Sequence, residues 1–199
     1  MPKILSELEI ADFQDRLCEV ATKLFAERGR EGFTMRELAG ELGVSPMTPY
    51  RYFRDKDAIL AAVRARAFDR FSDVLEKAFA IPGNAPEKAL KVYEAYVRFA
   101  FGEAPSYRLM FDIAHPDECD YPDLVRALTR ARATMTDYVR ALVAEKVFEG
   151  DPDLIGHVFW ASLHGAVMLE LSGHLSPECN FETIRRESFR ALIEGFRAK

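Results

Sequence analysis

The chain has 199 residues, of which 49% are hydrophobic, and its formal net charge is −5. The hydrophobic fraction is ample for a folded core, and the acidic balance argues against a protein that coats nucleic acid without sequence preference. We find no apolar run that we expect to cross a bilayer and no signal peptide in the Met-Pro-Lys start. The three cysteines form no Cys-x-x-Cys pair. We therefore expect a cytoplasmic protein with no membrane partner.

Helical periodicity runs through the whole chain, and no window alternates as a strand does. Proline and glycine mark the element ends, as in Pro82-Gly83-Asn84 and Glu149-Gly150. We expect nine helices: a first one that ends at Gly29, two short ones between 34 and 55, and six more at about 56–80, 86–101, 106–113, 122–148, 152–171 and 181–197.

The two short helices form a tight pair with an evident turn between them. Thr34 is suited to cap the first, with Glu37 as its capping-box partner and Phe33 as part of a hydrophobic staple. Gly43 follows the last apolar residue, where a left-handed turn needs no Cβ. Ser45 is suited to cap the second helix, which we expect to begin at Pro46. This spacing is typical of a helix-turn-helix that reads DNA, although helical hairpins of other kinds carry similar caps.

The same window resembles the TetR family of bacterial transcriptional regulators. The residues that carry the resemblance are Thr34, Ala39, Gly43-Val44-Ser45, Thr48-Pro49-Tyr50-Arg51-Tyr52-Phe53 and Lys56. It covers about residues 10 to 60, with the head most similar to AcrR-like members. A second stretch, FWASLHGAVMLELSGHL over 159–175, looks like the Trp-His-Gly type of C-terminal regulatory domain in that family.

The resemblance implies an all-α fold with two domains. A three-helix DNA-binding head would occupy residues 1–55, and a six-helix body for effector binding and dimerisation would occupy 56–199. One position departs from the family pattern, because Pro49 stands where a Leu, Ile or Val is usual. Proline removes a backbone donor and disfavours helical geometry at Thr48. The recognition helix is therefore expected to be short, or to start late with Thr48 as its cap.

The resemblance also assigns the contacts with double-stranded DNA. Phosphate contacts fall to Thr34, Tyr50, Tyr52 and Lys56, base contacts fall to Pro46, Met47 and Thr48, and Ser45 and Arg51 complete the expected DNA-binding set. Around this tip, Arg51, Arg54 and Lys56 are opposed by Asp55 alone. We expect binding that is local, specific for a palindromic operator, and sensitive to salt.

The last two expected helices suggest a dimer. Residues 155–171 are apolar almost all round, so this helix must be buried on every side. In the family such a pair meets its two-fold mate, which would make the chain a homodimer; the alternative is that the pair forms the core of a single chain. The candidate interface residues are Ile155, Leu163, Val167, Phe189, Leu192 and Phe196.

Aromatic residues of the body indicate a small-molecule effector. The candidate lining residues are Tyr93, Tyr96, Phe99, Tyr107, Met110, Phe111, Phe159, Trp160, His164 and Met168. Such a set could line an apolar cavity with a few polar tips or simply fill the core. The implied effector is uncharged or weakly polar, and aromatic or amphipathic.

Other functions find less support in the sequence. The chain has no Gly-rich phosphate loop, no Gly-x-Ser-x-Gly elbow and no His-Glu-x-x-His, so we predict no enzyme. We also predict no cofactor and no metal, because His115 and Cys119 lack a second pair with zinc spacing. His164 is expected to be structural or to touch the effector. The function we predict is a transcriptional regulator, most simply a repressor that an effector releases; the alternative is a helical interaction or ligand-binding module that does not read DNA.

Overall fold

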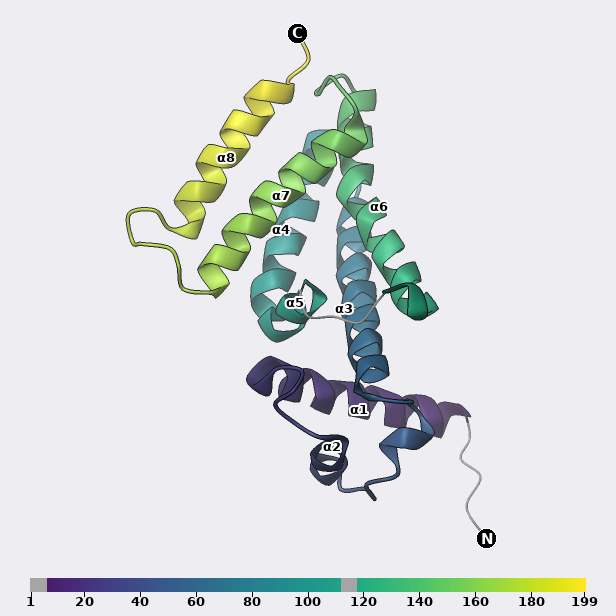
Figure 1. Ribbon diagram of the computed structural model, residues 1–199. Coiled ribbons are helices and arrows are strands. Elements are labelled where there is room, and N and C mark those ends of the chain that lie inside the picture. Colours follow the sequence, from purple (N-terminus) through teal and green to yellow (C-terminus); the bar gives the residue numbers. More distant parts are fainter. Residues whose placement is uncertain (1–6, 112–117) are drawn as a thin grey trace. The chain divides into compact units, whose positions relative to one another are not determined.

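The computed structural model describes residues 7–111 and 118–199, and all regular elements in those ranges are helical (Figure 1). The eight α-helices are α1 (Glu7–Arg28), α2 (Met35–Glu41), α3 (Lys56–Phe79), α4 (Ala85–Gly102), α5 (Ala104–Met110), α6 (Pro122–Ala144), α7 (Pro152–Leu171) and α8 (Phe181–Phe196). Two 3₁₀ turns, η1 (Pro49–Arg51) and η2 (Glu118–Asp120), complete the regular structure of the described ranges. The all-α fold that we predicted is confirmed.

The chain divides into two compact units. The head unit contains the residues up to Phe68 together with Pro105–Ala127, and the body unit contains Asp69–Ala104 and Leu128–Lys199. Helices α3 and α6 each contribute residues to both units.

The head unit is built around one apolar cluster. Buried side chains of α1, α2, α3 and α5 meet there, and the largest fully buried ones are Leu17, Leu38, Ile59 and Leu60. Phe33 lies just before α2 and packs edge-on against Phe25 of α1, with ring centroids 4.9 Å apart. Burial of these side chains fixes α2 against α1 and so positions the segment that follows α2.

Helix α2 begins and ends as the sequence predicts. The Thr34 side chain accepts from the Glu37 N–H, and the Glu37 carboxylate accepts from the Thr34 N–H at 2.7 Å, which completes a capping box. After α2, Gly43 has φ +67, and its N–H donates to Gly40 while that of Val44 donates to Ala39. This pair of bonds is a Schellman motif, which requires a left-handed residue at Gly43.

The expected third helix is the main difference between the predicted and the observed elements. Only Pro49–Arg51 is helical there, as the 3₁₀ turn η1, and Ser45 bonds the Thr48 hydroxyl at 2.9 Å instead of capping a backbone N–H. Thr48 occupies the N-cap position without a side-chain cap bond. The physical reason is Pro49, which has no N–H to donate and is itself buried. The expectation of a short, late segment is thus confirmed, and the expected start at Pro46 is wrong.

The body unit contains helices α4, α7 and α8 and parts of α3 and α6. Its core includes Val139, Leu142, Ile155 and Phe159. Gly156 is required where α7 crosses α6, because a Cβ there would lie 2.7 Å from the Met135 carbonyl oxygen. Helix α8 runs alongside α7 (Figure 1).

Helix α7 is long and apolar enough to cross a membrane by length and composition, with a mean hydropathy of 1.3. One such helix is weak evidence of a membrane span, and Ile155, Phe159 and Leu163 of α7 are buried in the body unit. One detail of the body corrects the sequence analysis. Helix α6 ends at Ala144 and not near Phe148, because Lys146 adopts a left-handed φ of 58 and closes a Schellman motif.

Candidate nucleic-acid interface and effector cavity

The segment after α2 presents an exposed tip. Met47 is 67% exposed and Tyr50 is 47% exposed, both large values for side chains of this type. Ser45, Pro46 and Arg51 are exposed as well, whereas Thr48 is half-buried. The tip is anchored to the head unit, because Pro49 and Leu42 are buried in it. An apolar methionine and a phenol that project from a fixed turn are suited to contact a second surface.

Three of the predicted DNA-binding side chains have a structural role in the head. Tyr52 is half-buried and its ring lies 4.7 Å from that of Phe13. The Lys56 ammonium donates to the Phe33 carbonyl at 2.8 Å and lies over the Phe33 ring at 4.9 Å. The Thr34 hydroxyl bonds both the backbone and the carboxylate of Glu37. These residues hold the N-termini of α2 and α3 in place.

Arg36 was missing from the sequence-based set. It lies on the exposed face of α2, opposite the buried Leu38 and Ala39. Arg36 and Arg51 make no ion pair with any residue in the described ranges, and both are exposed. By contrast, Arg54 donates to the Tyr121 hydroxyl at 2.9 Å and pairs with Asp55 at 3.1 Å. The helix period could have revealed Arg36, since it lies two residues before the buried Leu38.

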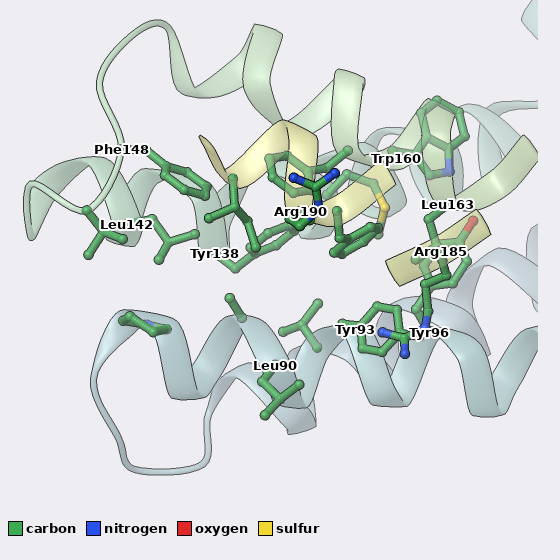
Figure 2. A pocket seen from close by; sticks show the side chains of 18 of the residues that line it. Leu90, Tyr93, Tyr96, Tyr138, Leu142, Phe148, Trp160, Leu163, Arg185 and Arg190 are labelled. Atoms are coloured by element: carbon green, nitrogen blue, oxygen red, sulfur yellow. The ribbon is translucent and has the colours of Figure 1, made fainter. Parts of the chain in front are cut away.

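The body unit contains a cavity of about 570 Å³. Its volume falls in the range of about 300–1,000 Å³ that is usual for small-molecule sites. Figure 2 shows Leu90, Tyr93 and Tyr96 of α4 on one side, with side chains of α6, α7 and α8 facing them. The walls are largely apolar, and the polar groups are tyrosines, Trp160 and charged residues of α8.

The predicted effector residues separate into three groups. Tyr93, Tyr96, Phe159 and Trp160 line the cavity. Phe99, His164 and Met168 belong to the body unit but do not line it, and Phe99 packs against Phe71 with ring centroids 5.3 Å apart. Tyr107, Met110 and Phe111 belong to the head unit. Aromatic content alone could not distinguish these groups, because an aromatic side chain is equally suited to line a cavity and to pack in the core of either unit.

The predicted effector residues leave out most of the lining: apolar residues such as Leu90 and Leu142, the pair Met135 and Tyr138, and the arginines of α8. Tyr138 follows Met135 by three residues on α6, and both face the cavity. Helix α8 and its C-terminal end supply the arginines Arg185, Arg186, Arg190 and Arg197. The helical spacing of the arginines was visible in the sequence. A row of charged residues on a terminal helix usually indicates a solvent-exposed face, so the spacing did not indicate a binding site.

Electrostatics within the cavity favour protonated tyrosines. Burial raises the pKa of Tyr138, and burial also raises that of Tyr93. The Arg185 guanidinium lies 5.2 Å from the Tyr93 ring, an attractive arrangement of cation and aromatic face. His164 lies outside the cavity lining, where burial lowers its pKa. The cavity therefore presents hydroxyl donors at neutral pH.

The candidate dimer residues lie within one chain's core. Ile155, Leu163 and Val167 are buried in the body unit, and Phe189, Leu192 and Phe196 are half-buried against its apolar cluster. The outward surfaces of α7 and α8 carry other residues. Leu154 is 60% exposed, Leu169 is 44% exposed, and Ala161 and Ala191 are exposed near the middle of their helices.

The described ranges contain no cluster of three or more potential metal ligands. His115, which we considered as a metal ligand, lies outside the described residues, and Cys119 is exposed.

A capped helix, a Schellman turn and an exposed tip on a helical core are parts of a helix-turn-helix motif, whose second helix is here reduced to the 3₁₀ turn Pro49–Arg51. Comparison with known proteins agrees. Residues 17–63 match the family described as "Bacterial regulatory proteins, tetR family", and residues 89–196 match "Tetracyclin repressor-like, C-terminal domain". The chain belongs to the TetR family of transcriptional regulators. Proteins of this family are bacterial transcriptional regulators that bind DNA.

Individual relatives show how far the likeness extends. The HTH-type transcriptional regulator SAUSA300_2515 of Staphylococcus aureus (strain USA300) is 41% identical over 58 residues, which are 29% of this chain and 31% of that protein. A protein of unknown function from Rhodococcus sp. RHA1 superposes with a TM-score of 0.78 at 26% identity, over 99% of both chains. The TetR family regulator PfmR from Thermus thermophilus superposes with a TM-score of 0.70 at 24% identity, over 90% of this chain and 98% of its own.

Proposed function

We propose that the protein is a homodimeric repressor that binds a palindromic operator and leaves it when a small, largely apolar effector occupies the body cavity. The observation that carries the proposal is the tip after α2. Met47 and Tyr50 project from a turn that buried residues hold in place. Arg51 of the tip and Arg36 of the neighbouring helix α2 are exposed as well, and neither has an ion-pair partner in the described part of the chain. Such a tip offers an apolar contact for thymine methyl groups and charged donors for phosphates.

The roles within the tip follow from chemistry. Met47 has no hydrogen-bonding group that phosphate favours, so we assign it to base edges in the major groove. Tyr50, Arg36 and Arg51 can each donate to phosphate oxygens, so we assign them to the backbone. Tyr52, Thr34 and Lys56 would act mainly by positioning, with Thr34 and Lys56 near enough to the surface to add phosphate contacts.

The effector would act by binding two conformations of the body unequally. Helix α6 provides a physical connection, since Met135, Tyr138 and Leu142 line the cavity while the first turns of the same helix belong to the head unit. A shift of α6 on ligand binding would move Tyr121, which bonds Arg54 of the head. The two DNA-binding heads of a dimer must lie about 34–36 Å apart to enter successive major grooves. A small change in the distance between the heads is therefore enough to weaken binding to the operator.

A second candidate function is a protein-interaction module that does not read DNA. One observation favours it: the expected recognition helix is reduced to the 3₁₀ turn Pro49–Arg51. Residues 1–55 also hold eight Lys and Arg against ten Asp and Glu, so the head as a whole is not basic. A module of this kind would show no preferred DNA sequence.

Selection from a random duplex DNA library separates the two functions. We expect the wild-type protein to enrich an inverted repeat. The Tyr50→Ala variant should bind every selected sequence about tenfold more weakly, the size of one lost hydrogen bond to a charged group. The Met47→Ala variant should enrich a different sequence with similar affinity.

The control for this selection is Met168→Ala, a substitution on α7 that is remote in sequence from the tip and outside the cavity lining. It should enrich the same repeat as the wild type. If no sequence is enriched at low salt, or if Tyr50→Ala selects and binds normally, the proposed interface is wrong and the interaction module becomes the better description.

A further inference from the structure

The mouth of the body cavity carries more positive than negative charge. Among the lining residues, four are arginines of α8 and its C-terminal end, and only Glu194 is acidic. Two further glutamates, Glu182 and Glu187, pair with those arginines from outside the lining. Four positive charges thus face three negative ones, an excess of one positive charge in a chain whose net charge is −5.

The ion pairs leave this excess positive charge on Arg197. Arg185 pairs with Glu182. Glu187 is shared, because Arg186 Nε lies 3.2 Å from it and an Arg190 nitrogen lies 3.1 Å from it. Arg190 also reaches Glu194 at 3.4 Å. Arg197 makes no ion pair with any residue that the structure describes, so its charge is uncompensated there.

These pairs can give way to a ligand. The side chains of Arg186 and Arg190 are 62% and 60% exposed, and solvent-exposed pairs of this kind add little to stability. Arginine presents a planar fork of N–H donors that matches a carboxylate with two parallel bonds. Arg190 and Arg197 can therefore turn to an incoming anion at small cost.

The interior behind the arginines is largely apolar and contains tyrosine hydroxyl donors. Leu90, Val92 and Leu163 form part of the wall, and Figure 2 shows Arg190 on the opposite side from Leu90. The Tyr138 hydroxyl has no hydrogen-bond partner among the described residues, and burial keeps it protonated by raising its pKa. A site of this kind has an apolar body, internal hydroxyl donors and a cationic rim.

We propose that the effector is an amphipathic monoanion, whose apolar chain or ring fills the cavity and whose carboxylate binds Arg190 and Arg197 at the mouth. The inference rests on the proposed function in that it names the ligand class of the same cavity. It differs from the sequence-based expectation of an uncharged or weakly polar effector, because that expectation did not include the arginines of α8.

Trp160 allows a direct test without DNA. It is the only tryptophan of the chain and it lines the cavity, so its fluorescence reports occupancy. We would titrate the purified wild-type protein with decanoate and with decanol, which share a chain and differ in charge. Decanoate should bind at least about tenfold more tightly, since the carboxylate gains charge-assisted bonds. Each methylene added from hexanoate to decanoate should tighten binding about fourfold, because more apolar surface is buried.

Variants then locate the anion site. The double variant Arg190→Gln, Arg197→Gln should lose at least about tenfold in decanoate affinity, because the charge-assisted bonds are gone. It should keep its decanol affinity, which also shows that the cavity is still folded. Arg132→Gln removes the same charge from an exposed position of α6 outside the cavity lining, and it should bind both probes as the wild type does.

The outcomes are decisive either way. Preference for decanoate that disappears in the double variant supports the inference. Equal or tighter binding of decanol, unchanged decanoate binding by the double variant, or no binding of either probe overturns it. Because the titration contains no DNA, a protein that binds decanoate but selects no operator would refute the proposed function and leave the ligand assignment standing.

Discussion

Single residues decide how closely the helices approach. Gly156 lies where α7 crosses α6, and an added Cβ would meet the Met135 carbonyl oxygen at 2.7 Å and the Thr136 Cα at 3.2 Å. These are backbone atoms, which cannot rotate aside. The same glycine therefore allows α7 to pack closely against the backbone of α6 at Met135 and Thr136.

We therefore expect Gly156→Ala to lower the free energy of unfolding by about 1–3 kcal/mol, the usual cost of overpacking. Urea denaturation at fixed protein concentration measures it. Gly40→Ala is the matched control, because Gly40 lies in helix α2 and an added Cβ there would meet no atom within 4 Å. Alanine also favours the helix by up to about 1 kcal/mol. If Gly156→Ala is as stable as the control, α6 and α7 are not in close contact there.

At the scale of the element, the cap of α2 determines where the DNA-binding tip begins. Thr34 bonds both the backbone and the side chain of Glu37, and those bonds lower the pKa of the Glu37 carboxyl below its usual 4.5. A carboxyl whose pKa is lowered by folding stabilises the folded state above the unfolded pKa. That stabilisation disappears as the pH falls through the folded pKa.

Removal of this cap should have a pH-dependent effect. Thr34→Ala should cost about 0.5–2 kcal/mol of unfolding free energy at neutral pH. Glu37→Ala should also destabilise at neutral pH, and its difference from the wild type should shrink as the pH falls below 4.5. Urea denaturation across a pH series tests both. A constant difference for Glu37→Ala would mean that the carboxylate does not act as a cap.

The elements also show what the sequence can predict. The cap at Thr34 and the stop at Gly43 act over three or four residues, so they were visible in the sequence and the structure bears them out. The end of α6 was missed because Lys146 takes a left-handed conformation that favours glycine. Its Schellman motif receives long-range support, since the Glu149 N–H donates to the Phe196 carbonyl. Contacts of this kind join residues far apart in the chain, and no local pattern signals them.

The cavity illustrates the same limit. Tyr93 and Tyr96 line the cavity as expected, yet Tyr107, which is of the same residue type and was also expected there, lies in the other unit. Which aromatic residues meet depends on how α4, α6, α7 and α8 pack, and the apolar pattern of each helix fixes only which side is buried. The arginines of α8 became meaningful only when their helix was seen to border an apolar cavity.

At the scale of the whole molecule, the proposed dimer requires an outward face on α7 and α8. Ala161 is exposed on α7, and Leu154 and Leu169 of the same helix are exposed although they are large and apolar. Small residues allow close approach of a second chain, and exposed leucines would be buried by it. A buried, unpaired charge at such a face is costly.

We therefore expect Ala161→Glu to be monomeric at concentrations where the wild type is a dimer, as measured by sedimentation equilibrium. Its affinity for the selected inverted repeat should fall at least about tenfold, because one half-site then binds without the other. Ala133→Glu is the control, since Ala133 is exposed on α6 and lies outside α7 and α8. A dimeric Ala161→Glu protein would place the interface elsewhere.

The most direct measurement of the central proposal is the binding of the purified protein to its selected inverted repeat, to a single half-site and to a random duplex, over a range of salt concentrations. A dimeric reader of DNA should bind two chains per repeat and prefer the repeat to the random duplex by at least about a thousandfold. Its affinity should fall steeply with salt, with a slope of about −0.9 for each phosphate contact. Equal affinity for the repeat and the random duplex would contradict sequence recognition, and equal affinity for the repeat and the half-site would contradict the dimer.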